Sequence, residues 1–285
     1  MNSALTLSSR SISTILQVYT RDDGKAFVAE FLAMAMFVIV GCGTVVSSQS
    51  LAAFDPNSSL DNSFLTAVAL AFGIGIVVLA YSIAPISGAH INPAVTFSFM
   101  LLGEIPVLKG MLYITSQLFG ALLGASILYG MTASNSLEEA SGGAPAFLLG
   151  SNTVQPDLPL GSAFLGECVG TFILVWTVMM TAVHKKNVAG NLAPLAIGLS
   201  VLLAHLLLVP FTGCGINPAR SFGPHIVVVF AGDKVGYEGW WIFYTAPFVG
   251  AAAATFLSDF LFVVANEAEE TLIVDDAEDE VVEDC

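Results

Sequence analysis

The chain has 285 residues, of which 55% are hydrophobic and 11% are charged. Soluble domains carry about 25% charged residues, so this composition excludes an ordinary soluble protein. The formal net charge of −15 comes largely from the C-terminal end, because residues 266–285 contain ten acidic residues and no basic residue. A run of like charges repels itself, and we expect those residues to form a disordered, solvated acidic tail.

The first half of the chain begins with a polar segment, residues 1–25, which lacks the apolar stretch of a signal peptide. Three apolar spans follow, at residues 26–48, 64–81 and 110–131. A helix needs roughly 20 apolar residues to cross a bilayer core of about 30 Å, and each span comes close to that length. The first span carries one acidic residue, Glu30, and the other two carry no charge.

The second half repeats this arrangement, with apolar spans at residues 160–183, 189–212 and 239–258. Its first span again carries one acidic residue, Glu167, and its second contains His205. The pattern predicts an all-α membrane protein with six transmembrane helices.

Nearly the same eleven residues occur twice, 125 positions apart, as SGAHINPAVTF from Ser87 and TGCGINPARSF from Thr212. Asn is a favoured N-cap and Pro is favoured at the first helical position, so each copy predicts the start of a helix. The residues at these two starts are Asn92, Pro93, Ala94, Asn217, Pro218 and Ala219.

The helices that follow the repeated motifs, residues 93–101 and 218–228, are too short to cross a membrane. At about 1.5 Å per residue each covers roughly half of the bilayer core. Irregular backbone at that depth is tolerated where it lies within protein or lines a water-filled cavity. Each motif therefore predicts a re-entrant loop followed by a half-helix.

An odd number of spans in each half means that the second half inserts upside down. We expect one membrane domain at residues 26–265, an inverted repeat of the halves 26–131 and 160–265, with its site at their interface. The N-termini of the two half-helices then meet, and each carries roughly half a positive charge, which repels cations and hydronium. Asn92 and Asn217 can cap their helices through oxygen and still offer N–H donors to the lumen.

The two acidic residues within the spans, Glu30 and Glu167, need partners, because a carboxylate at bilayer depth is costly. We interpret them as acceptors that anchor the N–H groups of the re-entrant loops. A proton relay is the alternative.

Basic residues concentrate on the cytoplasmic side of membrane proteins. With six spans both termini lie on one side, and six of the eight basic residues fall on that side, with Lys234 as an exception. They are Arg10, Arg21, Lys25, Lys109, Lys185 and Lys186. We expect both termini in the cytoplasm, and the membrane is either the plasma membrane or that of an organelle.

The sequence contains no nucleophile–base pair, phosphate-binding loop or metal-ligand spacing among its four cysteines. We therefore expect no enzyme, no cofactor, no metal site and no nucleic-acid partner.

The stretches AEFLAMAMFVIVGCGT, SGAHINPAVT, GECVGTF and TGCGINPARSFGP resemble the aquaporins of the major intrinsic protein family. The resemblance covers about residues 26–265. It implies a right-handed bundle of six helices and two half-helices, a pore in every subunit, and a homotetramer in the lipid bilayer.

The resemblance also implies a narrow selectivity filter at Phe72, His205, Cys214 and Arg220. This combination is similar to that of water-selective members, whereas glycerol-conducting members carry Trp and Gly in place of the Phe and His.

We expect a passive water channel. The alternatives are a channel for another small neutral solute (hydrogen peroxide, ammonia or glycerol), a coupled secondary transporter, or an adhesion protein with a vestigial pore. His225 departs from the family, which usually has a small residue there, and is hypothesised to alter packing or to add pH sensitivity.

Overall fold

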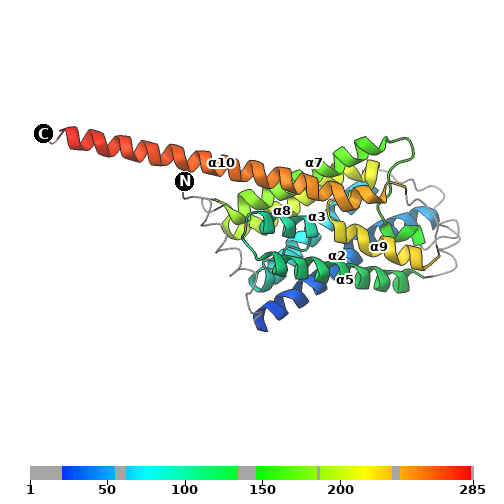
Figure 1. Cartoon of the computed structure of the whole chain (residues 1–285). Helices are drawn as coiled ribbons and strands as arrows, with labels where there is room; N and C mark the ends of the chain where they lie inside the picture. The colour runs from blue at the N-terminus through cyan, green and yellow to red at the C-terminus, as the bar shows by residue number, and fades with distance from the viewer. Residues whose placement is uncertain (1–20, 55–61, 134–145, 185–186, 233–237, 284–285) are drawn as a thin grey trace.

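The computed structural model describes residues 21–54, 62–133, 146–184, 187–232 and 238–283. Six of its helices are long and apolar enough to cross a membrane, and they lie side by side as a bundle (Figure 1). No strand occurs within the described ranges, so the expected all-α membrane fold is confirmed. Residues 1–20, the larger part of the expected N-terminal segment, lie outside the described residues.

The first half of the chain forms three spanning helices and one half-helix, followed by a short helical turn. These elements are α2 (Arg21–Phe54), α3 (Asn62–Ser87), α4 (Pro93–Leu101), α5 (Val107–Thr132) and the turn η1 (Ala146–Gly150). The half-helix α4 has the bounds expected from the motif, and the spanning helices extend beyond their apolar cores.

The second half forms the same series in the same order. Its elements are α7 (Leu160–Val178), the π-helical turn η2 (Met179–Val183), η3 (Gly190–Leu192), α8 (Ala193–Thr212), α9 (Pro218–Phe230) and α10 (Trp240–Glu283). The half-helix α9 ends two residues later than the sequence predicts.

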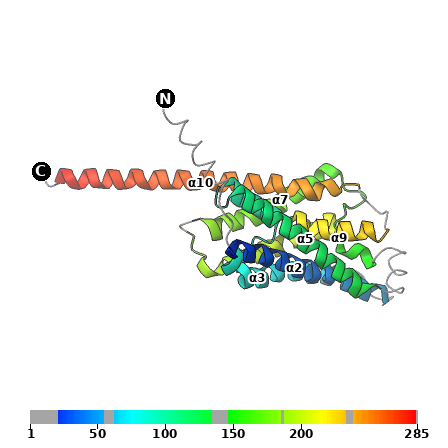
Figure 2. The ribbon, with the colours of Figure 1, turned by 60° about the horizontal axis from the view of Figure 1, so that its bottom comes forward.

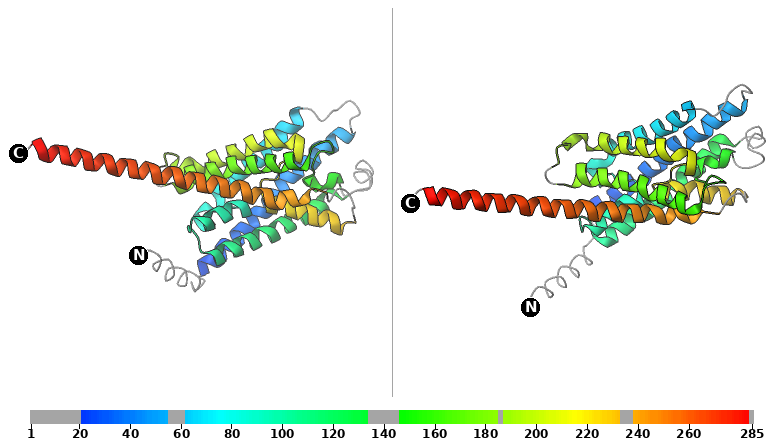
Figure 3. Two further views of the ribbon diagram at one scale, coloured as in Figure 1. Left: turned by 45° about the horizontal axis from the view of Figure 1, so that its top comes forward. Right: turned by 90° about the horizontal axis from the view of Figure 1, so that it is seen from above.

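The packing of the helices repeats between the halves. Helix α2 packs against α3 and α5, and α7 packs against α8 and α10 in the same way. Each half-helix also reaches into the other half, since α4 packs against α10 and α9 packs against α5. The two half-helices run from the middle of the bundle toward opposite ends (Figure 3). The two half-helices thus have opposite orientations, as expected for an inverted repeat with an odd number of spans in each half.

Two glycines allow the closest approach of helices in the bundle. A Cβ atom at Gly120 of α5 would collide with the backbone oxygen of Phe31 in α2. A Cβ atom at Gly250 of α10 would collide in the same way with the backbone oxygen of Cys168 in α7. Small residues at such crossings bring helix backbones together, which gives van der Waals packing in a membrane.

The last helix reaches into residues 266–285, for which the sequence predicts an acidic tail. Helix α10 continues without a break to Glu283 and projects beyond the bundle (Figure 2). The sequence after Gly250 contains neither Gly nor Pro and is rich in residues that favour helices, such as Ala, Glu and Leu.

Candidate functional site

The two re-entrant loops share an unusual backbone conformation. Ala89 and Ile91 in the first loop have φ of 55° and 50°, and Cys214 and Ile216 in the second have φ of 56° and 46°. A residue with a side chain pays about 1–2 kcal/mol to adopt this left-handed conformation. The four strained positions match pairwise across the repeat, so both loops need support from their surroundings.

The carboxylate of Glu30 supports the first loop. Its Oε1 accepts from the backbone N–H of His90 at 2.9 Å and from the hydroxyl of Ser87 at 2.7 Å. Its Oε2 accepts from the backbone N–H of Ile91 at 2.7 Å and from the side-chain amide of Gln117 at 2.8 Å. Four hydrogen bonds satisfy a carboxylate that is completely buried.

Glu167 supports the second loop through equivalent atoms. Its Oε1 accepts from the hydroxyl of Thr212 at 2.6 Å and from the backbone N–H of Gly215 at 2.8 Å. Its Oε2 accepts from the backbone N–H of Ile216 at 2.7 Å. The structure thus brings both spanning carboxylates to the loop N–H groups.

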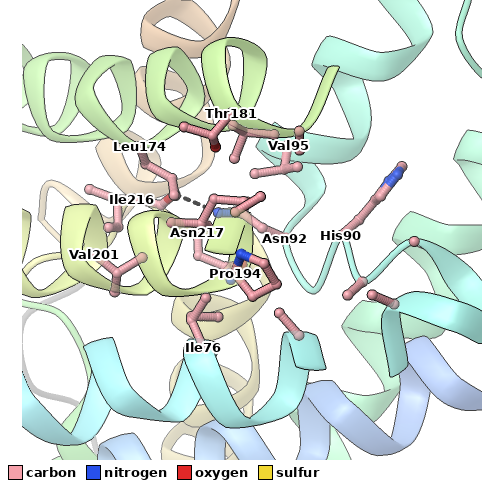
Figure 4. Close-up of a pocket in the computed structure, with 18 of the residues that line it drawn as sticks. Ile76, His90, Asn92, Val95, Leu174, Thr181, Pro194, Val201, Ile216 and Asn217 are labelled. Atoms are coloured by element: carbon pink, nitrogen blue, oxygen red, sulfur yellow. Dashed lines mark hydrogen bonds between the residues drawn. The ribbon is translucent and has the colours of Figure 1, made fainter. Parts of the chain in front are cut away.

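The asparagines of the two motifs meet between the loops. The side-chain oxygen of Asn92 accepts from the backbone N–H of Ala94 at 2.8 Å, and that of Asn217 accepts from Ala219 at 3.1 Å. Both are therefore N-caps, of α4 and α9. Figure 4 shows the two side chains together in the pocket, where the amide of Asn92 also donates to the backbone oxygen of Ile216.

Three of the four positions that the resemblance assigns to a filter, Phe72, His205 and Arg220, lie together in the structure. The rings of Phe72 and His205 are stacked with centroids 4.3 Å apart, and the guanidinium carbon of Arg220 lies 4.8 Å from the centroid of Phe72. These side chains and that of Cys214 are at most 2% exposed. The two stacked rings and the buried cation form one closely packed cluster, which we call the constriction.

Two polar groups at this constriction have no hydrogen-bond partner among the described residues, the Nε2 of His205 and the Nε of Arg220. The Nδ1 of His205 lies 2.8 Å from the backbone oxygen of Val201, which can only accept, so Nδ1 carries the proton. In the neutral ring Nε2 is then an acceptor, whereas the Nε of Arg220 is a donor. A small molecule that both donates and accepts satisfies this pair.

Two cavities adjoin Arg220 of this cluster. The inner cavity, of about 260 Å³, is lined by both motif asparagines, by His205 and by Arg220. The outer cavity, also of about 260 Å³, is lined by Arg220 together with Gln49 and Ser151. The side chain of Arg220 therefore borders both cavities.

Two supports of the site, Gln117 and Gly150, were not predicted from the sequence. Gln117 is a buried amide within an apolar helix, and its polarity at that place is a signal that could have identified it. The backbone oxygen of Gly150 accepts from Arg220 Nη1 at 3.0 Å. A backbone contact of this kind has no signature in the sequence.

Within the described ranges no group of three His, Cys, Asp or Glu side chains is placed to hold a metal ion. The polar side chains that line the inner cavity are instead amides, imidazoles, a hydroxyl and one guanidinium.

Comparison with known proteins is consistent with this geometry. A family model described as Major intrinsic protein matches residues 17–258. The chain belongs to the major intrinsic protein family. Aquaporin-1 of Sus scrofa is 39% identical over 237 residues, which cover 83% of this chain and 82% of that protein. Aquaporin-1 of Rattus norvegicus is 40% identical over 237 residues, with 83% and 81% covered.

A solved structure shares the fold. The X-ray structure of the aquaglyceroporin from Plasmodium falciparum matches with a TM-score of 0.71, covering 83% of this chain and 96% of that chain. At 23% identity this likeness concerns the fold alone. Membership of the major intrinsic protein family confirms the expected resemblance, and with it a channel rather than an enzyme.

Proposed function

We propose that this member of the major intrinsic protein family is a passive water channel. Water passes in single file through a pore in each subunit, and glycerol, protons and ions are excluded. The observation that carries the proposal is the constriction that adjoins the two cavities, where an acceptor on His205 and a donor on Arg220 stand beside the ring of Phe72.

The dimensions of the constriction favour water over glycerol. Phe72 and His205 are bulky, and their stacked rings, with centroids 4.3 Å apart, leave no room for a solute between them, so that any passage is confined to their edges. His205 also makes the wall polar at the place where a carbon chain would need an apolar surface. Water donates to one group and accepts from the other, so it replaces its own hydrogen bonds as it passes.

The charges of the lumen oppose cations. Arg220 carries a permanent positive charge and is 2% exposed, so solvent screens it little. The N-termini of α4 and α9 add roughly half a positive charge each near Asn92 and Asn217. A hydronium ion meets repulsion at both places, whereas neutral water does not.

Hydrogen peroxide, ammonia and glycerol are the alternative solutes, and the width of the filter opposes glycerol most.

A coupled secondary transporter is a weaker alternative, because it needs a group that is free to bind a coupling ion or a proton. The carboxylates of Glu30 and Glu167 already accept four and three hydrogen bonds. Their engagement also argues against a proton relay.

We propose in addition that both termini face the cytoplasm. The start of α2 and the projecting end of α10 lie at the same end of the bundle (Figure 2). Lys25 is close to that start, and Lys109 forms an ion pair of 2.9 Å with Asp23 in the first turn of α2. Basic residues mark the cytoplasmic side. A plasma membrane and an organelle membrane both suit this orientation.

A homotetramer in the bilayer is the assembly that we propose from the family resemblance. Large apolar side chains are exposed on the outer faces of the spanning helices, where lipid or a neighbouring subunit covers them. Native mass spectrometry from mild detergent tests this proposal, with a mass of four chains expected and a monomer as the contrary result.

Stopped-flow light scattering on proteoliposomes tests the proposed transport. Under a sucrose gradient we expect shrinkage much faster than that of protein-free vesicles. Under a glycerol gradient we expect the slow re-swelling of protein-free vesicles. Water flux at the protein-free rate, or glycerol flux well above it, contradicts the proposal.

A further inference from the structure

His225 connects three parts of the fold, namely helix α9, helix α10 and the segment that contains Asn152. It lies on α9, one and a half turns beyond Arg220, and is completely buried. Its Nδ1 lies 2.8 Å from the hydroxyl of Tyr244 in α10, and its Nε2 lies 2.9 Å from the backbone oxygen of Asn152. Its ring stacks on Trp240, with centroids 3.7 Å apart and 2° between the planes.

The chemistry of the partners decides the direction of both hydrogen bonds. A backbone oxygen can only accept, so Nε2 carries the proton and donates to Asn152. In the neutral ring Nδ1 is then the acceptor, and the hydroxyl of Tyr244 donates to it. His225 therefore needs one donor and one acceptor, a combination that the small residue usual in the family does not offer.

Asn152 is bound to its surroundings at three atoms. Its side-chain oxygen accepts from the hydroxyl of Ser221 at 2.8 Å, and its side-chain amide donates to the backbone oxygen of Thr212 at 3.2 Å. Its own backbone oxygen accepts from His225. Ser221 and His225 are four residues apart on α9 and so lie on one face of that helix. Ser221 and His225 of α9 therefore both form hydrogen bonds with Asn152.

The residues before Asn152 adopt a strained conformation. Residues 147–149 are not glycine, yet they have φ of 48°, 55° and 51° in succession. Such a conformation persists only when the surrounding structure holds it in place. The backbone oxygen of Gly150, the next residue, accepts a hydrogen bond from Arg220. We call residues 147–152 the anchor segment.

We propose that His225 is a positioning residue for the selectivity filter. It clamps the anchor segment to α9 and thereby fixes the Gly150 oxygen that holds the guanidinium of Arg220. This inference rests on the proposed function, because it assumes that Arg220 selects among solutes. Without the clamp the anchor segment relaxes, Arg220 loses its fixed acceptor, and the filter admits larger neutral solutes.

Two variants separate hydrogen bonding from packing. His225→Phe keeps an aromatic ring that can stack on Trp240 but removes both hydrogen bonds. His225→Gln loses the ring but keeps one donor and one acceptor, separated by about the same distance as the two ring nitrogens. Ser221→Ala removes the second hydrogen bond between α9 and Asn152, and it replaces His225→Phe in the test if that variant does not fold.

The first measurement is the ratio of glycerol to water permeability in proteoliposomes. We expect a several-fold rise in this ratio for His225→Phe and a ratio near the wild-type value for His225→Gln. A change of packing alone predicts the opposite order, because Gln disturbs the ring stack more than Phe does. An unchanged ratio in His225→Phe, or the opposite order, overturns the inference.

The second measurement is amide hydrogen exchange of the anchor segment, which does not depend on transport. The backbone N–H of Ser151 donates to the backbone oxygen of Leu148 at 2.9 Å, so its exchange reports whether the segment is held. We expect faster exchange in His225→Phe and not in His225→Gln. Unchanged exchange in His225→Phe overturns the clamp, even if the wild-type protein conducts no water and the proposed function itself has failed.

Discussion

Asn92 and Asn217 are linked reciprocally at the centre of the bundle. The side-chain amide of each donates to the backbone oxygen of the isoleucine that precedes the other, Ile216 and Ile91, at 2.9 and 2.8 Å. Each side-chain oxygen caps its own half-helix, so each amide keeps one further N–H for a solute. The two halves are thus tied together where both helix N-termini concentrate positive charge.

The first prediction concerns the charge at this point. Asn217→Asp keeps a good N-cap but replaces the amide donor with a carboxylate that faces the oxygen of Ile91. We expect a leak of sodium ions or protons that the wild-type protein lacks, because the new negative charge offsets the two helix termini. The measurement is ion flux into proteoliposomes that contain a fluorescent indicator.

Asn191→Asp is the control for this variant, because Asn191 is exposed in the segment before α8. It adds the same charge outside the lumen, and we expect no leak. Equal leaks in the two variants would mean that the helix termini are not what excludes cations.

The second prediction concerns the width of the filter. His205→Ala removes the ring that stacks on Phe72 and opens the constriction. A change of pocket size by a few carbon atoms alters discrimination by about tenfold or more, so we expect glycerol permeability to rise by about that factor. Leu203→Ala on the exposed face of the same helix is the matched control. Glycerol flux that stays low in His205→Ala would show that another element sets the width.

The third prediction concerns the thiol at the filter. Cys214 is buried between Gly213, which lines the outer cavity, and Gly215, which lines the inner cavity. A mercury adduct on its sulfur obstructs the passage, so we expect mercuric chloride to block water flux and Cys214→Ser to abolish the block. Cys168→Ser, on α7, serves as the comparison and should remain sensitive. A mercury block that persists in Cys214→Ser would place the reactive thiol elsewhere.

The fourth prediction concerns the packing of α5 on α2. Gly120→Ala places a methyl group against the backbone oxygen of Phe31, whereas Gly130→Ala in the same helix meets no atom within 4 Å. Overpacking of this kind costs about 1–3 kcal/mol, so we expect a clearly lower thermal unfolding midpoint for Gly120→Ala in detergent. For Gly130→Ala we expect a midpoint at or slightly above that of the wild type, since Ala favours a helix over Gly. Equal midpoints would mean that α2 and α5 are farther apart than described.

The sequence predicts the half-helices well because their signals are local. An N-cap, a proline and a repeat identify the starts of α4 and α9, and a lone carboxylate in an apolar span identifies Glu30 and Glu167 as residues in need of partners. These features depend on residues that are neighbours in the chain or that recur at a fixed spacing.

The anchor segment could not be predicted, because its conformation is imposed from a distance. Residues 147–149 are apolar and not glycine, and nothing in their type indicates left-handed backbone. From the sequence, His225 is a departure from the family, and the hypotheses for it are pH sensitivity or altered packing. Its partner Asn152 lies 73 positions away in the chain, so the clamp is visible only in three dimensions.

The most direct test of the account measures water and proton permeability in the same proteoliposomes. Vesicles loaded with a pH-sensitive dye are exposed in turn to an osmotic gradient and to a pH gradient, beside protein-free vesicles. We expect water permeability far above that of the protein-free vesicles and proton permeability equal to it. Proton flux that rises together with water flux would contradict the claim that Arg220 and the paired helix termini let water pass and exclude hydronium.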